Sequence, residues 1–174
     1  MKISANAIKE LRDTTCASIA HCKKALEDAK GDIKEAAILL RKQGLEIAAK
    51  KQSRSAKEGR VDAYIHHGNK IGVLLEVNCE SDFVARNEEF TRFTKDLAMQ
   101  IAATSPAYIK KEDVPPEILQ HEKSKEDYYK NNCLLEQVFV KDPSMTIKDY
   151  LGSIVSKLGE NIVIRRFQRY KIGE

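Results

Sequence analysis

The segment from Ile71 to Ile101 constrains the fold more than any other part of the chain, because its pattern changes from strand to helix within a few residues. Residues 71–77 form a short apolar run, Ile-Gly-Val-Leu-Leu-Glu-Val, whose branched side chains are typical of a β-strand. Beyond it, apolar residues recur at helical spacing, at Phe90, Phe93, Leu97 and Ile101. The pattern predicts a strand followed by a helix that lies across the same sheet.

An acidic residue and an aromatic residue, Asp82 and Phe83, stand at the junction between these two patterns. Ser81, Asp82 and Asn87 are residue types that cap helices by accepting backbone N–H bonds, so the helix is expected to begin here, in one step or in two. One interpretation is structural: Phe83 lies seven residues before Phe90 and could share its buried face. The other is that the pair is placed to enter a binding partner.

The neighbouring segments predict an antiparallel sheet. Residues 60–66 and 71–78 read as two strands joined by His67-Gly68-Asn69-Lys70, whose Gly-Asn pair suits a tight hairpin turn. A two-stranded hairpin is only marginally stable, and the best candidate for a third strand is residues 161–170, with apolar side chains at Ile162, Ile164 and Phe167. Thr146 with Asp149 is expected to cap a helix before that strand.

The first fifty residues predict three short helices that must pack together to be stable. The first begins at Ala5, the second ends near Lys30, and the third begins after Asp32, which forms a capping box with Glu35, and runs to Gly44. A basic connector follows. The predicted domains are a three-helix module at 1–52, a basic linker at 53–59 and an α+β core with the dimerisation surface at 60–174.

The region from residue 105 to residue 141 has the weakest pattern. Pro106, Pro115 and Pro116 are expected to stop helices there, and residues 117–130 are charged enough to form an exposed helix.

Composition excludes some classes of function. With 174 residues, 32% charged side chains and a formal net charge of +4, the chain can bury a core and is expected to be a folded cytoplasmic protein without membrane segment or signal peptide. Residues 1–60 carry 14 Lys or Arg against 8 Asp or Glu. This excess could meet an acidic partner or a phosphate backbone, or it could simply be solvated helix surface.

No metal site or cofactor is expected. The cysteines form no CxxC pair and the histidines have no zinc spacing, so buried thiols in a reducing compartment are the simplest interpretation. These residues are Cys16, Cys22, Cys79 and Cys133, and His21, His66, His67 and His121.

The segment Asn-Cys-Glu-Ser-Asp-Phe-Val-Ala-Arg-Asn at residues 78–87 resembles the signature loop of the elongation factor Ts family, the exchange factors for elongation factor Tu in bacteria and organelles. Further matches follow in the family's order, from about residue 5 to the carboxyl end. They are Leu11-Arg12, Cys22-Lys23-Lys24-Ala25-Leu26, Gly31-Asp32, Ala48-Ala49-Lys50-Lys51, Leu134-Leu135-Glu136-Gln137, Gly159-Glu160-Asn161-Ile162 and Arg165-Arg166-Phe167. Several separated motifs in the right order are far more specific than any one of them.

The resemblance implies a fold and a function. The amino-terminal module would have the ubiquitin-associated fold, and the chain would be a guanine-nucleotide exchange factor in protein biosynthesis rather than an enzyme. It would bind elongation factor Tu in its GDP-bound and nucleotide-free forms, without direct nucleic-acid binding.

The resemblance also implies which residues make contact. Phe83 would insert between two helices of the GTPase domain near its magnesium site, and Asp82 would help to rearrange the groups that hold the ion or, as a helix cap, would aim Phe83. Lys23 would contact a helix of the same domain. His67, in the hairpin turn, would dock on a distant domain, and Leu158 with Gly159 would form another contact turn.

The sequence departs from the family pattern at two places. Relatives commonly have Thr-Gly-Ala-Gly-Met-Met-Asp-Cys where this chain has Thr15-Cys16-Ala17-Ser18-Ile19-Ala20-His21-Cys22, which removes two glycines and two methionines. A helical stretch is also shortened between Leu119 and Cys133. The long forms repeat the strand and helix unit, whereas this chain has one copy, so a homodimer is expected.

Two other classes of function remain open. In one, the helical module is a non-catalytic binding module for a protein or nucleic acid, and binding to nucleic acid would weaken steeply with salt. In the other, the chain is an enzyme or redox protein that uses Cys79 or the histidines, which would require a perturbed thiol or a metal.

Overall fold

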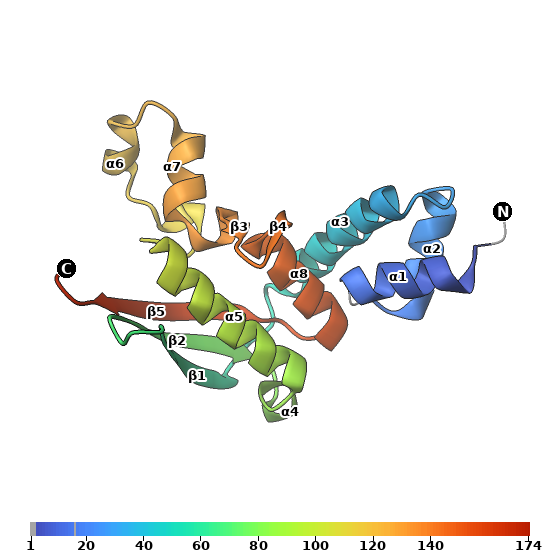
Figure 1. Cartoon of the computed structure of the whole chain (residues 1–174), viewed down its shortest axis with the longest axis horizontal. Coiled ribbons are helices and arrows are strands. Elements are labelled where there is room, and N and C mark those ends of the chain that lie inside the picture. The colour runs from blue at the N-terminus through green and yellow to red at the C-terminus, as the bar shows by residue number, and fades with distance from the viewer. Residues whose placement is uncertain (1–2, 16) are drawn as a thin grey trace. The chain divides into compact units, whose positions relative to one another are not determined.

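The computed structural model describes residues 3–15 and 17–174, and its chain divides into two compact units (Figure 1). The first unit comprises the residues up to Arg54 together with Leu151–Asn161, and the second comprises Ser55–Tyr150 together with Ile162–Glu174. The first unit is helical and the second combines helices with an antiparallel sheet, so the predicted α+β class is confirmed.

The amino-terminal helices of the first unit are α1 (Ala5–Thr15), α2 (Ile19–Asp28) and α3 (Ile33–Lys51). The Ser18 Oγ accepts a hydrogen bond from the His21 N–H at 3.2 Å and so caps α2. Asp32 caps α3 in the same way, accepting from the Glu35 N–H at 3.0 Å. The helices enclose a core of Leu11, Cys22, Ala25, Leu26, Ala36 and Leu40. Each helix buries an apolar face against the others, as their shortness requires.

The prediction that α3 ends at Gly44 is wrong, because the helix continues to Lys51. Gly44 is buried, and a Cβ atom there would lie 3.2 Å from the backbone oxygen of Gly152. Gly152 belongs to α8 (Ile147–Leu158), whose residues from Leu151 onward are part of the first unit. The glycine therefore permits two helix backbones to approach closely and does not act as a helix end.

The sheet of the second unit consists of β1 (Glu58–Ile65), β2 (Ile71–Cys79) and β5 (Val163–Lys171), antiparallel and in the order β1-β2-β5. The predicted hairpin and its partner strand are confirmed. The connection is longer than a two-residue turn: the His66 N–H donates to the Ile71 carbonyl at 2.9 Å and the Asn69 N–H donates to the His66 carbonyl at 2.9 Å, so residues 67–70 form the loop. Gly68 and Asn69 have positive φ in it, at 88° and 56°, which these residue types tolerate well.

Helix α5 (Glu88–Thr104) covers one face of this sheet, as Figure 1 shows. Its apolar residues are fully buried, and they pack toward the buried side chains of the central strand. The helix contributes Phe90, Phe93, Leu97 and Ile101, and the strand contributes Val73, Leu75 and Val77. The helical and strand periodicities of the sequence meet at this interface, which is the core of the unit.

The segment after α5 differs from its prediction. The exposed helix expected over 117–130 is instead two short helices, α6 (Pro116–Gln120) and α7 (Lys125–Asn132). They are flanked by 3₁₀ turns at Lys111–Asp113 and Leu134–Glu136, and a small hairpin follows, formed by β3 (Val138–Phe139) and β4 (Asp142–Thr146). The buried Gln100 side chain holds this hairpin against α5, accepting from the Val140 N–H at 2.9 Å and donating to the Val138 carbonyl at 3.1 Å.

The expected cap of α8 is present, with Thr146 Oγ1 accepting from the Asp149 N–H at 3.1 Å.

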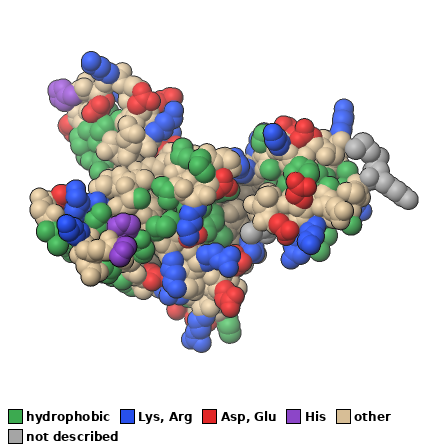
Figure 2. Space-filling model, in the orientation of Figure 1, with side chains coloured by type: hydrophobic (Ala, Val, Ile, Leu, Met, Phe, Trp, Pro, Cys, Tyr) green, Lys and Arg blue, Asp and Glu red, His purple; other side chains and the backbone are tan. Residues whose placement is uncertain are grey.

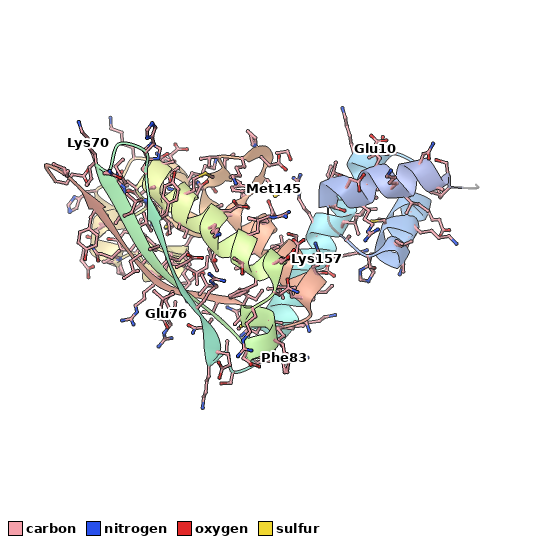
Figure 3. All side chains as sticks on the ribbon, turned by 60° about the horizontal axis from the view of Figure 1, so that its bottom comes forward. Glu10, Lys70, Glu76, Phe83, Met145 and Lys157 are labelled. Atoms are coloured by element: carbon pink, nitrogen blue, oxygen red, sulfur yellow. The ribbon has the colours of Figure 1, made fainter. Side chains whose placement is uncertain are left out.

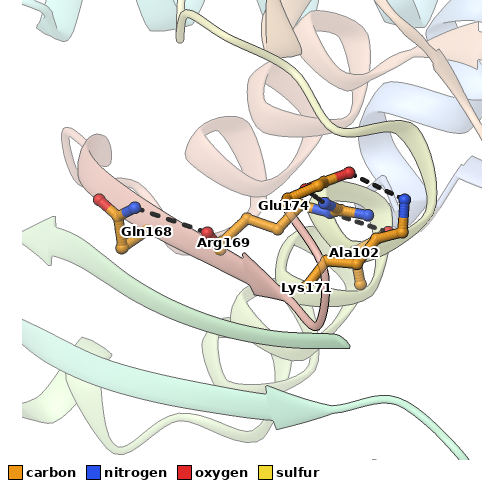
Figure 4. Close-up of polar contacts among 5 residues, drawn as sticks. All are labelled: Ala102, Gln168, Arg169, Lys171 and Glu174. Carbon is orange, nitrogen blue, oxygen red and sulfur yellow. Dashed lines mark hydrogen bonds and ion pairs between the residues drawn. The ribbon is translucent and has the colours of Figure 1, made fainter. Parts of the chain in front are cut away.

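The end of β5 is tied to the end of α5 by a charged cluster (Figure 4). The Arg169 Nε donates to the Ala102 carbonyl at 3.3 Å, and its Nη1 lies 2.8 Å from Glu174 Oε2. Lys171 also pairs with Glu174, and it lowers the pKa of that carboxyl. A cation at the carboxyl end of a helix is favourably placed in the helix dipole.

None of the helices in the described part of the chain has the length and hydropathy of a membrane span.

Replacement of Gly59 by alanine should destabilise the sheet more than the same change at Gly68. Both residues have φ in the range that favours glycine, at 143° and 88°, which costs alanine about 1–3 kcal/mol. At Gly59 a Cβ would also lie 2.2 Å from the Val77 carbonyl oxygen, an overlap that adds about 1–3 kcal/mol. At Gly68 it would meet no atom within 4 Å. Urea unfolding of Gly59→Ala and Gly68→Ala tests this, and equal losses of stability would contradict it.

Candidate partner-binding site

The strand-to-helix junction begins its helix in two steps. Ser81 caps the one-turn helix α4 (Asp82–Ala85), its Oγ accepting from the Val84 N–H at 3.4 Å. Asn87 then caps α5, its Oδ1 accepting from the Glu89 N–H at 2.8 Å. Each cap satisfies a backbone donor that the start of a helix leaves without a partner. The loop from Ser81 to Asn87, which we call the exchange loop, is thus fixed at both ends.

Asp82 does not cap this helix, so that part of the interpretation of its role is wrong. It is the first residue of α4, and its Oδ2 lies 3.1 Å from a guanidinium nitrogen of Arg86, one turn further on. Both side chains are substantially exposed, at 46% for Asp82 and 79% for Arg86. The i,i+4 spacing of the two residues was the available sequence signal for this pair.

Phe83 is 81% exposed, and the alternative in which it shares the buried face of Phe90 is wrong. Phe90 is fully buried. The physical reason is the break at Asn87, whose φ of −65° and ψ of 140° are extended, so that the helical phase does not carry through from α4 to α5. Figure 3 shows Phe83 on the short α4 turn, at the end of the hairpin opposite to Lys70.

The other residue of the second unit that the family resemblance indicates is His67, which is exposed in the β1–β2 turn. Its neighbour His66 is also exposed, and the His66 Nδ1 lies 3.0 Å from the Tyr64 hydroxyl. The exchange loop and His67 thus stand at opposite ends of β2.

The remaining residues that the resemblance indicates lie in the first unit. Lys23 is exposed on α2, with its Nζ 3.9 Å from Glu27. Leu158 is half-buried at the end of α8, and Gly159 follows it with a φ of 76° and its N–H bonded to the Val155 carbonyl at 3.0 Å. The Gly159 carbonyl in turn accepts a hydrogen bond from the Lys51 ammonium.

The geometry of the cysteines argues against nucleophilic chemistry. Cys22, Cys79 and Cys133 are buried, whereas Cys16 lies outside the described residues. Burial raises the pKa of Cys22, and burial together with the nearby Glu136 raises the pKa of Cys133 to about 11. Reactive thiols have lowered pKa values. Among residues 3–15 and 17–174, no three His, Cys, Asp or Glu side chains gather into a group that could hold a metal ion.

Truncation of Phe83 should leave the stability of the protein almost unchanged. An exposed side chain contributes little, so Phe83→Ala is expected to change the free energy of unfolding by less than about 0.5 kcal/mol. The matched control Phe90→Ala removes a fully buried ring and should cost about 3–5 kcal/mol. Urea unfolding followed by circular dichroism measures both. A large loss of stability in Phe83→Ala would contradict this prediction, because it would show that the ring is part of the packed core.

Comparison with known proteins identifies the family to which the chain belongs. The model of the family described as Elongation factor TS matches residues 1–127 and 124–174. The elongation factor Ts of Caldanaerobacter subterraneus is 52% identical, in a match that covers 99% of this chain and 98% of that protein. Those of Thermodesulfovibrio yellowstonii and Geobacter sulfurreducens are each 46% identical over 100% of this chain, covering 98% and 91% of those proteins.

The same comparisons show that a stretch of the relatives is missing from this chain. The alignment with the Caldanaerobacter protein spans 195 positions, whereas this chain has 174 residues, so that protein carries residues that this chain lacks. The two matched parts of the family model overlap at residues 124–127, at the start of α7. The match nevertheless extends over the whole chain, at about half identity, and the chain belongs to the elongation factor Ts family.

Proposed function

We propose that this chain performs its family's function through the exchange loop, with Phe83 as the group that enters the partner. Members of the family are exchange factors, not enzymes: they promote release of GDP from elongation factor Tu during translation elongation. The observation that carries the proposal is the position of Phe83, an aromatic ring that is 81% exposed on a short helix capped at its start.

Exposure of this ring in the unbound protein leaves free energy to be gained on binding. Transfer of a Phe side chain from water to an apolar site is worth about 1.5–3 kcal/mol. The exchange loop is held by its two caps, so little conformational entropy is lost when it docks. A pre-positioned aromatic side chain of this kind is the usual centre of a binding hot spot.

Exchange also requires that the Phe83 ring bind one nucleotide state of the partner more tightly than another. A ligand with equal affinity for two states shifts no equilibrium between them. GDP is held by a phosphate loop and a magnesium ion that bridges phosphate oxygens, so the nucleotide leaves slowly while those contacts are intact. A ring that enters between two helices near this site would bind the nucleotide-free state more tightly and would thereby weaken the hold on GDP.

Asp82 acts through its charge in this proposal, since Ser81 supplies the cap. Its carboxylate is paired with Arg86 in the unbound chain, and the pair is exposed enough to exchange partners at little cost. A carboxylate that is brought close to the magnesium site would compete for, or repel, the groups that hold the ion. Arg86 would then keep the carboxylate in position until docking.

His67 supplies a second contact, far from the first. The nine residues of β2 separate the exchange loop from the β1–β2 turn, which corresponds to about 30 Å of extended chain. A partner that touches both ends must therefore present surfaces from well-separated regions, such as two domains. Lys23 and the Leu158-Gly159 turn, on the first unit, would add contacts of their own.

The open face of the sheet supports a homodimer. α5 covers one face, while on the other Val61, Ile65, Leu74 and Tyr170 are between 50% and 65% exposed. Ile65 and Tyr170 both lie beside Gly72 in the strand register, and Leu74 lies two residues further along the same central strand. Exposed apolar side chains gathered on one face are typical of an interaction surface. A second copy of this chain presents the same face, and its sheet would supply what the repeated unit supplies in the long forms of the family.

The site of action proposed for this protein is the cytoplasm, where translation elongation takes place.

Loss of the Phe83 ring should abolish most of the exchange activity. We expect the parent protein to accelerate release of a fluorescent GDP from elongation factor Tu, and Phe83→Ala to reduce that acceleration at least about tenfold, because each 1.4 kcal/mol of lost contact is a factor of ten. Asp82→Asn should reduce it less, since it removes the charge and leaves the Ser81 cap. Release is followed by stopped-flow fluorescence with excess unlabelled GDP as chase.

Ile38→Glu serves as the control for this experiment, because Ile38 is 54% exposed on α3 of the first unit and has no role in the proposal. Full activity of Phe83→Ala would show that the ring is not the wedge. A parent protein that leaves GDP release unchanged at any concentration would contradict the function as a whole and would favour a binding module.

Introduction of a charge on the open sheet face should separate the dimer. Leu74→Glu places a carboxylate on the central strand, where an apposed sheet would have to bury it without a partner. Sedimentation equilibrium should give a dimer for the parent and a monomer for this variant, with at least about a tenfold rise in the dissociation constant. Ile38→Glu should remain dimeric. A monomeric parent protein at high micromolar concentration, or a dimeric Leu74→Glu variant, would rule out this interface.

A further inference from the structure

A shallow hollow beside the exchange loop gathers positive charge, and neither the family resemblance nor the sequence pattern indicated it. It has a volume of about 440 Å³ and lies within the second unit. Its charged lining consists of Arg86, Arg92, Lys95 and Lys141, with Glu88 and Asp96. Figure 2 shows Lys and Arg side chains gathered over the part of the surface where α5 runs next to α4. We call this feature the basic hollow.

The basic hollow is built by the fold and not by neighbours in sequence. Arg86 closes α4, and Glu88, Arg92 and Lys95 follow along α5 at helical spacing, on the side away from its buried residues. Lys141 comes from the turn between β3 and β4. It is anchored by Asp96, which is only 6% exposed and whose Oδ1 lies 2.6 Å from the Lys141 ammonium.

The ion pairs of the hollow leave a positive excess. Asp96 neutralises Lys141, and its second oxygen accepts from the Tyr150 hydroxyl at 3.0 Å. Asp82 neutralises Arg86. In the described part of the chain, Arg92 and Lys95 make no ion pair, and Glu88 is the remaining carboxylate of the lining. Arg92 and Lys95, neither of which is in an ion pair, therefore share the hollow with one unpaired carboxylate, that of Glu88.

We infer that the basic hollow receives carboxylate side chains on the protein surface that takes up Phe83, an inference that rests on the proposed function. Arg86 follows Phe83 by three residues, so a protein that covers the ring also lies against the hollow. Charges that are desolvated without a partner are costly, so a surface that fits here must bring carboxylates to Arg92 and Lys95. The occupant is thus an acidic patch beside the groove that accepts the ring.

The lining favours a protein over a nucleic acid as the occupant. Glu88 is exposed among the cations and would repel a phosphate backbone, whereas it can accept hydrogen bonds from a protein surface. The lining also contains no aromatic side chain on which a base could stack. Its role would be to guide the encounter, because exposed complementary charges mainly raise association rates.

The test is the rate of association with GDP-bound elongation factor Tu, measured by stopped flow at several salt concentrations. The double charge reversal Arg92→Glu with Lys95→Glu should slow association by about tenfold or more at low salt and should weaken its salt dependence. The dissociation rate should rise as well, because the introduced carboxylates would face those of the partner in the complex. Both side chains are exposed, so the fold should survive, and circular dichroism checks this. Arg92→Ala with Lys95→Ala gives a milder form of the same test.

The matched control is Lys123→Glu with Lys125→Glu, which makes the same change in net charge on exposed residues next to and within α7. Equal association rates for the two double variants would overturn the inference, since only overall charge would then matter. Unchanged association together with weaker binding to an RNA oligonucleotide would overturn it in favour of nucleic acid. The proposed function is judged separately, because it fails only if the parent protein does not accelerate GDP release.

Discussion

The cap that Asn87 places between α4 and α5 is the local interaction on which the proposed site depends. Without it, a helix continuing from Ser81 would carry Phe83 and Phe90 on one face, and both rings would face the sheet. The Asn87 Oδ1 bond to the Glu89 N–H instead starts a new helix at an extended residue. Phe90 then begins the buried face of α5, and Phe83 is left 81% exposed on a separate turn. One break in helical phase thus assigns one aromatic ring to the core and the other to a partner.

The sheet and α5 give that turn a rigid support. The apolar residues of α5 pack on the central strand, whose outer neighbours β1 and β5 are both antiparallel to it. Because β2 runs between the exchange loop and the β1–β2 turn, its length sets the separation of two proposed contacts with the partner. The same helix carries Arg92 and Lys95 on its outer side, so one element organises the core, the proposed wedge and the basic hollow.

Local chemistry made much of the fold predictable. The Gly68-Asn69 loop and the Ser81, Asn87 and Asp32 caps all depend on residues that act within a few positions along the chain. The third strand was predictable from its apolar pattern, although it pairs with the distant β2. The sequence predictions were wrong where contacts between distant segments of the chain determine the structure. Gly44 looks like a helix end but allows close packing against Gly152, and the β3–β4 hairpin is held by Gln100, some forty residues earlier in the chain. Phe83 itself was ambiguous, since periodicity alone cannot show where a cap resets the helical phase. The candidate site came from the family resemblance, and the basic hollow depends on Lys141, which nothing in the sequence pattern connects with α5.

In the proposed function, Phe83 binds the nucleotide-free partner more tightly than the GDP-bound one. The most direct measurement is the dissociation constant of the parent protein and of Phe83→Ala for elongation factor Tu, with GDP bound and with the nucleotide removed. We expect loss of the ring to weaken binding to the nucleotide-free form at least about tenfold more than binding to the GDP-bound form. An equal loss of affinity for both forms would contradict it, because the ring would then hold the complex together without driving exchange.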